Sequence, residues 1–84
     1  MTFKVIVSKH AFKELAAIDG KDQRAVYEKI KELEHGIFKN GKALKGKHKG
    51  KFRKRCGRYR IIYLRENDIL LITVIRLAHR KEAY

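Results

Sequence analysis

The alternation of hydrophobic and polar positions at the start of the chain predicts a β-strand. Phe3, Val5 and Val7 recur at every second position, which is the period of a strand with one well-buried face. We therefore expect a strand over residues 3–7. Ser8 follows it directly, at the position where a side-chain oxygen can cap a helix.

The hydrophobic spacing then changes to steps of three and four, which predicts two short helices that form a hairpin. The first ends at Asp19-Gly20, where glycine can adopt the left-handed conformation that terminates a helix. Asp22 is the expected cap of the second helix, which closes near Gly36. The apolar positions are Phe12, Leu15, Ala16 and Ile18 in the first helix, and Val26, Tyr27, Ile30, Leu33 and Ile37 in the second.

The second half of the chain predicts a loop followed by three strands. Residues 38–51 are rich in Gly and Lys and have little to bury, so we expect a mobile loop. Strand patterns follow over 51–56, 59–65 and, after a turn at residues 66–68, 69–77; the last is nearly all apolar, as expected for a central strand. The chain is therefore expected to be one α+β domain over residues 1–84, a β-α-α-β-β-β fold with a helix hairpin packed on a twisted, mainly antiparallel four-stranded sheet.

The composition narrows the protein class. The single cysteine, Cys56, excludes an internal disulfide and is expected to be a buried core residue. The first ten residues contain only a short apolar run interrupted by Lys4, so they indicate neither a signal peptide nor a membrane span, and we expect a cytoplasmic protein. The four histidines lack metal-ligand spacing, and we expect no metal and no cofactor; His10, His35 and His48 are interpreted as surface residues.

Positive charge is concentrated in one segment of the chain. The net charge is +13, and the residues between His35 and Arg65, with Arg65 included, hold twelve Lys and Arg and no acidic residue. The preceding 34 residues carry seven basic and six acidic side chains, and the last 19 carry three of each. This segregation indicates a polyanionic partner. The glycines at positions 41, 46, 50 and 57 interrupt the segment, which argues against the basic amphipathic helix that a membrane surface would require.

Strand alternation divides the basic segment into two faces. Arg53, Arg55, Arg58 and Arg60 are expected on one face and Phe52, Cys56, Tyr59, Ile61 and Tyr63 on the core face. Lys54 interrupts the core set, which leaves the register open. Arginine suits phosphate because its planar fork donates two parallel hydrogen bonds. The alternative is a merely solubilising face, or pairing with Glu28, Glu32 and Glu34 of the helices.

Two motifs then indicate a family. The stretch LKGKHKGKFRKRCGRYRIIY (residues 44–63) and the terminal HRKEAY (79–84), in this order and around an apolar strand, resemble the RelE branch of the RelE/ParE toxin superfamily, and the resemblance covers essentially the whole chain. It implies a ribosome-dependent endoribonuclease of a type II toxin-antitoxin pair. Such an enzyme cuts messenger RNA in the ribosomal A site by attack of a ribose 2′-hydroxyl on its own 3′ phosphate, and an acidic RelB-like antitoxin neutralises it.

The resemblance also implies a set of site residues. Arg60 and Arg80 would hold the scissile phosphate, and Tyr84 would stack on a base or take part in proton transfer. Where several relatives have a lysine general base this chain has Arg55, so the base stays open among Lys54, His79 and Tyr84, or catalysis rests mainly on charge stabilisation. The catalytic positions are Arg53, Arg55, Arg60, Arg80 and Tyr84, and the expected RNA or ribosome contacts are Lys45, Lys47, Lys49, Lys51, Lys54, Arg58 and His79.

Two other functions fit a small basic domain of this kind. One is a ParE-like toxin that inhibits DNA gyrase without being a nuclease, and the other is a plain RNA-binding module. Chains of the ParE type generally lack the full set of basic residues and tyrosine, and no pair of aromatic residues typical of an RNA-binding sheet is present. The nuclease is therefore the preferred hypothesis. His79 has a second interpretation, as a residue that only caps the end of its strand.

Overall fold

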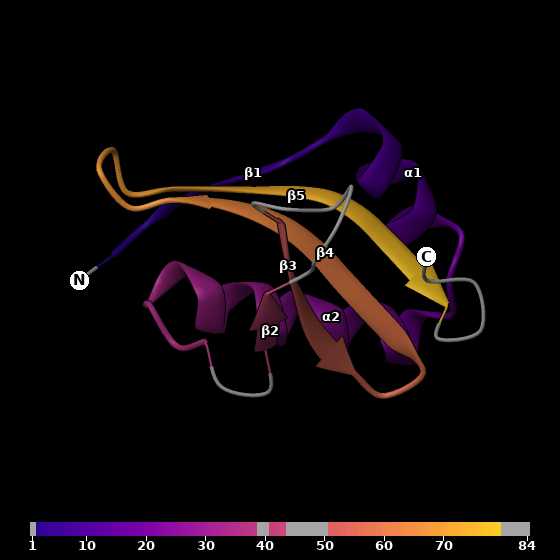
Figure 1. Ribbon diagram of the computed structural model, residues 1–84. Coiled ribbons are helices and arrows are strands. Elements are labelled where there is room, and N and C mark those ends of the chain that lie inside the picture. Colours follow the sequence, from indigo (N-terminus) through magenta and orange to yellow (C-terminus); the bar gives the residue numbers. More distant parts are fainter. Residues whose placement is uncertain (1, 39–40, 44–50, 80–84) are drawn as a thin grey trace.

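The computed structural model of the protein is a single sheet with two helices on one face (Figure 1). It describes residues 2–38, 41–43 and 51–79. In chain order the elements are β1 (Lys4–Val7), α1 (Lys9–Ala16), α2 (Gly20–Glu34), β2 (Gly41–Ala43), β3 (Lys51–Cys56), β4 (Tyr59–Glu66) and β5 (Leu71–His79).

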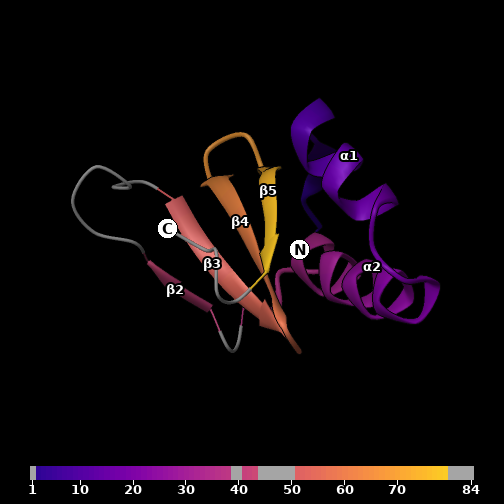
Figure 2. The ribbon, with the colours of Figure 1, turned by 90° about the vertical axis from the view of Figure 1, so that its right-hand side faces the viewer.

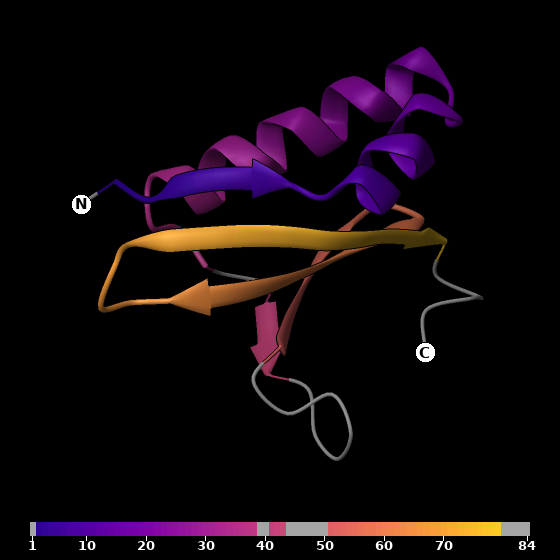
Figure 3. The same cartoon turned by 90° about the horizontal axis from the view of Figure 1, so that it is seen from above.

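The sheet has the strand order β1-β5-β4-β3-β2. β1 pairs with β5 in parallel, and the other three pairs are antiparallel. Figure 2 shows both helices on the same side of the strands, and Figure 3 shows the same arrangement from above, with α2 lying beside β1. We call the face covered by α1 and α2 the inner face and the opposite one the outer face. The predicted helix hairpin on a mainly antiparallel sheet is confirmed.

β2 is an addition to the four predicted strands. Residues 41–43 lie within the segment that the sequence predicted as a loop, but they pair with β3, with Gly41 opposite Lys54 and Ala43 opposite Phe52. The loop prediction was wrong for these residues. Three residues are too few to show a periodic pattern, and their strand conformation comes from pairing along the edge of β3.

The connection between the two helices differs from the prediction. Ser8 caps α1 as expected, with its Oγ accepting the Ala11 N–H at 3.2 Å. α2, however, begins at Gly20 rather than after Asp22, because the Gln23 N–H already bonds to the carbonyl of Asp19 at 2.8 Å. The side chain of Gln23 also donates to the carbonyl of Leu15 at 3.0 Å. The end of α1 is therefore satisfied from α2 and does not need Gly20 as a terminator.

Gly36 ends α2 as predicted. Its φ is 77°, its N–H bonds to the carbonyl of Leu33 at 3.0 Å, and the Ile37 N–H bonds to that of Glu32 at 2.8 Å. This pair of bonds satisfies the last carbonyls of the helix, and the left-handed backbone favours glycine. The chain is thereby turned back toward the sheet.

Among the described residues no helix is long and apolar enough to cross a membrane.

The core lies between the helices and the inner face. Leu33, Ile61 and Ile72 are fully buried, and Cys56 is buried as predicted. Burial raises the pKa of the Cys56 thiol, so it stays neutral. The other members of this cluster are Phe3, Ala11, Leu15, Val26, Tyr63, Val74 and Leu77.

The turn before β5 is longer than the sequence predicted. β5 lies between β1 and β4 as expected, but it begins at Leu71 rather than at residue 69. Leu70 has a φ of 52° and Ile69 is 61% exposed, so both belong to the turn. Hydrophobicity alone could not separate them from the strand, because the turn packs Leu70 against the core.

Candidate functional site

The register of the three middle strands brings four arginines to the outer face. Residues that are direct cross-strand partners share a face of the sheet. One row across β3, β4 and β5 is Arg53, Ile62 and Arg76, and the next row is Arg55, Arg60 and Ala78. The predicted grouping of Arg53, Arg55 and Arg60 is therefore present, and we call these three with Arg76 the arginine face.

Arg60 occupies the centre of the arginine face. Arg55 is directly opposite it on β3, while Arg53 and Arg76 are its diagonal neighbours on either side. Diagonal neighbours in a sheet lie about 7–8 Å apart at their Cα atoms, within reach of side chains as long as arginine. Like charges in this arrangement repel by roughly 1 kcal/mol per close pair. An anion bound among them removes that repulsion.

The floor of the arginine face is apolar. Ile62 and Ala78 are only 6% and 2% exposed, although they point away from the helices. Arg55 is exposed and Arg53 and Arg60 are partly exposed. A charge-assisted hydrogen bond above such a floor meets less competition from water than one on an open surface. The face therefore suits a phosphate that lies across β3 and β4.

A β-bulge decides that Arg76 belongs to this face. The β4–β5 register shifts between Ile62 and Tyr63, with Ile62 opposite Arg76 but Tyr63 opposite Val74. Ile75 is thus an extra residue in β5, and the alternation reverses after it. Uninterrupted alternation from the buried Val74 would place Arg76 on the inner face. The sequence analysis missed Arg76 for this reason; the available signal was a single arginine within an otherwise apolar strand.

Lys54 lies on the inner face, and its predicted roles as an RNA contact or general base were wrong. Its side chain is 1% exposed, its Nζ lies 3.0 Å from Glu32 Oε1, and it donates to the carbonyl of Ile37 at 3.3 Å. Alternation in β3 turns Lys54 inward with Phe52 and Cys56. The hydrogen bond from Lys54 lowers the pKa of Glu32 below its ordinary value, which keeps the carboxylate charged.

Replacing Lys54 by methionine should leave activity intact. The Lys54→Met variant keeps most of the buried aliphatic volume and removes a charge that faces α2. Such an exchange of a buried ion-pair member for an apolar side chain is tolerated best when the remaining partner can reach solvent. Glu32 is 28% exposed and meets that condition. We expect growth inhibition equal to wild type on induction. Loss of growth inhibition in a variant that circular dichroism shows to be folded would support a functional role for Lys54.

A second residue of the basic segment is also used within the fold. The Arg65 guanidinium lies 4.4 Å from the centre of the Phe38 ring and 4.5 Å from that of Phe52. These contacts are cation–π interactions on the inner side of β4. The positive segment therefore divides into residues that stabilise the fold and residues that are presented on the outer face.

The other residues predicted for the site do not all lie on the arginine face. Lys51 shares the outer face with Arg53, and Arg58 is exposed in the β3–β4 turn. His79 is opposite Tyr59 on the inner side, with ring centroids 5.6 Å apart, and so does not join the arginines. Arg80, Tyr84, Lys45, Lys47 and Lys49 lie outside the described residues. Within the described part of the chain, no three His, Cys, Asp or Glu side chains are grouped so that they could hold a metal.

Comparison with known proteins identifies the class. Residues 5–84 match the family model described as the ParE toxin of the type II toxin-antitoxin system parDE, and the chain belongs to this family. Within the RelE/ParE superfamily it is a RelE-like toxin, because it resembles the RelE-type toxins of Mycobacterium tuberculosis and Pyrococcus horikoshii in sequence and fold. None of the curated proteins matches the sequence.

Solved structures of RelE-type toxins share the whole fold. The toxin in the RelBE2 toxin-antitoxin complex of Mycobacterium tuberculosis is 25% identical, with a TM-score of 0.86 over 95% of this chain and 100% of that one. The toxin in the RelE-RelB complex of Pyrococcus horikoshii is 27% identical, with a TM-score of 0.83 over 99% and 100%. The isolated RelE toxin of Escherichia coli is 16% identical, with a TM-score of 0.74 over 99% and 88%, and shows the fold alone.

Proposed function

We propose that this toxin is a ribosome-dependent endoribonuclease that cleaves messenger RNA in the A site and so stops translation. The observation that carries the proposal is the pairing of Arg55 with Arg60, flanked by Arg53, on a sheet face that no described helix covers. Three guanidinium groups on a fixed strand register form a preorganised site for a phosphodiester. The site acts in the cytoplasm, where ribosomes and messages are found.

The chemistry assigned to the arginine face is charge stabilisation. A ribose 2′-hydroxyl attacks the adjacent 3′ phosphate, a 2′,3′-cyclic phosphate forms, and the 5′ oxygen of the next nucleotide leaves with a proton. Negative charge on the non-bridging oxygens rises in the transition state, and Arg60 is positioned centrally to stabilise it. Arg53 and Arg55 hold the neighbouring backbone. Arginine does not give up a proton near neutral pH, so these groups act as cations and not as the base.

Arg80 and Tyr84 complete the proposed site. We assign Arg80 a second contact to the scissile phosphate and Tyr84 a stacking or proton-transfer role, from the terminal HRKEAY motif. Lys54 is no longer a candidate for the general base because its ammonium group is buried against Glu32. His79 is opposite Tyr59 on the inner side of the sheet. Tyr84 therefore remains the proposed base, or catalysis rests mainly on charge stabilisation. Lys45, Lys47, Lys49, Lys51 and Arg58 are proposed contacts to RNA or the ribosome.

We also propose that an acidic RelB-like antitoxin binds and neutralises this chain. Two observations support the partner: the net charge of +13, and the similar toxins of M. tuberculosis and P. horikoshii, which were solved in complex with their antitoxins. Charge complementarity of this size favours fast association. An acidic protein that covers the arginine face would also compete directly with RNA.

The terminal motif provides a test of the proposed nuclease. Induction of the full chain should arrest translation and produce new 5′ ends within messages, mapped by primer extension. Arg80→Ala should reduce cleavage by about 10²-fold or more because it removes a transition-state contact, and Tyr84→Phe should separate stacking, which phenylalanine preserves, from proton transfer. Intact ribosome-bound messages in arrested cells would contradict the proposal.

A second candidate function follows from the name of the family model, which is that of ParE toxins. It is inhibition of DNA gyrase without RNA cleavage. The two functions give opposite results in one experiment, because a gyrase inhibitor lowers the negative supercoiling of a plasmid while messages stay intact. Supercoiling that is unchanged during growth arrest would exclude this second function.

A further inference from the structure

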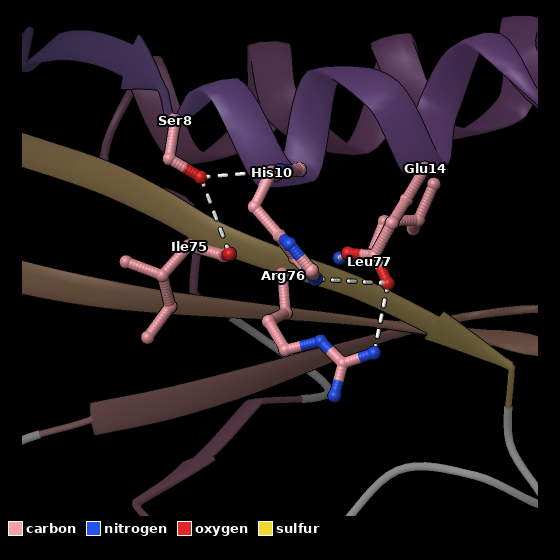
Figure 4. Close-up of polar contacts among 7 residues, drawn as sticks. Ser8, His10, Glu14, Ile75, Arg76 and Leu77 are labelled. Atoms are coloured by element: carbon pink, nitrogen blue, oxygen red, sulfur yellow. Dashed lines mark hydrogen bonds and ion pairs between the residues drawn. The ribbon is translucent and has the colours of Figure 1, made fainter.

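Glu14 of α1 connects the end of β5 to the arginine face. Its Oε1 accepts the backbone N–H of Leu77 at 2.8 Å, and its Oε2 accepts Arg76 Nη2 at 2.8 Å (Figure 4). The carboxylate is 22% exposed and the Arg76 side chain 42%. One carboxylate thus fixes both the backbone and a side chain of the same strand, and charge-assisted bonds of this length are strong.

This contact lies beyond the point where β5 stops pairing with β1. The parallel ladder between β1 and β5 ends at Val7 and Val74, followed by a bond from the Ser8 N–H to the carbonyl of Val74 at 2.9 Å. Beyond that point Ser8 Oγ donates to the carbonyl of Ile75 at 3.2 Å. Farther along β5, Glu14 Oε1 accepts the hydrogen bond of the Leu77 N–H. Side chains of the α1 region therefore replace β1 as the edge partner of β5, at the bulge that turns Arg76 outward.

We propose that Arg76 is a further RNA-phosphate contact of the toxin and that Glu14 is the positioning residue that orients it. The inference rests on the proposed function of the arginine face and extends it by one strand. Arg76 lies diagonally beside Arg60, in the same row as Arg53. An RNA backbone that crosses β3 and β4 at Arg55 and Arg60 meets Arg76 one phosphate farther along, on β5.

Glu14 holds one terminal nitrogen of Arg76. The Arg76 side chain stays partly exposed, so a phosphate can approach it while the bond to Glu14 fixes the direction of the side chain. His10 Nε2 lies 3.8 Å from the same Glu14 Oε2. Fixing a long side chain before RNA arrives reduces the conformational entropy lost on binding.

The test of Arg76 is the salt dependence of RNA binding. The probe is a labelled single-stranded RNA with 2′-O-methyl riboses, which lack the attacking hydroxyl and cannot be cleaved, and binding is followed by fluorescence anisotropy. Loss of one phosphate contact should lower the slope of log K against log salt by about 0.7 for a single strand. We expect this for Arg76→Gln. The matched control is Arg24→Gln, which removes the same charge from an exposed position on α2 and should keep the wild-type slope.

The test of Glu14 separates positioning from simple charge. Glu14→Gln keeps an oxygen for the Leu77 N–H but removes a negative charge, so electrostatics alone predicts tighter RNA binding and no loss of rate. Positioning predicts a several-fold fall in cleavage kcat with RNA affinity equal to or above wild type. Arg76→Lys, which keeps the charge but not the fork, should retain the salt slope and share the lower kcat.

Each outcome decides one question. Arg76→Gln with the slope of Arg24→Gln would overturn the Arg76 assignment, and Glu14→Gln with wild-type or higher kcat would overturn the positioning role. If Glu14→Gln does not fold, the comparison of Arg76→Lys with the wild type tests the orientation alone, and equal kcat in these two proteins would contradict it. RNA binding without any salt dependence in the wild type would instead contradict the proposed function of the whole face.

Discussion

Arg60→Ala is expected to abolish toxicity without weakening the fold. Arg60 is the central member of the arginine face, with Arg55 opposite and Arg53 and Arg76 on its diagonals. Loss of a group that stabilises transition-state charge lowers kcat by about 10²–10³-fold. Arg60 lies on the outer face, outside the core cluster, so the variant should remain folded and unfold cooperatively on heating. Ribosome-programmed cleavage and thermal unfolding measure the two effects on one sample.

Arg24→Ala is the matched control for Arg60. It removes the same charge from an exposed position of α2, on the other side of the sheet, and should retain toxicity. Arg60→Lys should fall between Arg60→Ala and the wild type, because it keeps the charge and loses the two-pronged geometry. An Arg60→Ala variant that remains fully toxic would remove the arginine face from the mechanism, and reduced supercoiling in the same cells would then support the gyrase function.

Glu32→Gln is expected to have the largest effect on stability. It removes the carboxylate whose Oε1 lies 3.0 Å from the Lys54 ammonium group, on a side chain that is only 1% exposed. An uncompensated buried charge costs several kcal/mol when both partners are fully buried; because Glu32 is 28% exposed, we expect about 2 kcal/mol here. For a domain of this size that corresponds to a fall in melting temperature of about 10 °C.

The pH dependence of this effect has a defined sign. The hydrogen bond from Lys54 lowers the pKa of Glu32 in the folded state below its ordinary value of 4.5. A lowered carboxyl pKa contributes stability that is complete above the unfolded pKa and is lost as the pH falls through the folded one. The difference in stability between wild type and Glu32→Gln should therefore be constant near neutral pH and shrink below about pH 4.5.

Glu28→Gln is the control for Glu32. Glu28 is exposed on the same helix, so the substitution removes the same charge without touching Lys54. It should change the free energy of unfolding by no more than about 0.5 kcal/mol. Equal effects of the two substitutions, or a Glu32 effect that persists unchanged into acid, would show that the buried ion pair contributes nothing.

Much of the fold could be predicted because the local patterns are strong. Period-two alternation in β1, the cap at Ser8 and the end of α2 at Gly36 depend only on neighbouring residues, and the structure agrees at each. Errors occurred where distant segments compete with local preference. Gln23 satisfies the end of α1 from the next helix, and pairing with β3 makes a strand of residues 41–43.

The candidate site was predicted in part for the same reason. Alternation along β3 and β4 was enough to place Arg53, Arg55 and Arg60 together. Alternation placed Lys54 within the core set, but its charge led to its assignment as an RNA contact or base; Glu32 on α2 compensates that charge inside the fold. His79 was assigned by its neighbours in the sequence and lies with Tyr59 on the inner side of the sheet.

The sequence by itself determined the class of this protein: a small basic α+β toxin whose positive charge lies in one segment, with arginines at alternate strand positions. Only the tertiary structure decided which of those charges belong to the surface. Lys54 is turned into an ion pair with α2, and one extra residue in β5 rotates Arg76 to the outer face beside Arg60. Local alternation already points Lys54 inward, but its counter-charge on α2 and the extra residue in β5 depend on strand register and on partners far away in the chain, which no local pattern encodes.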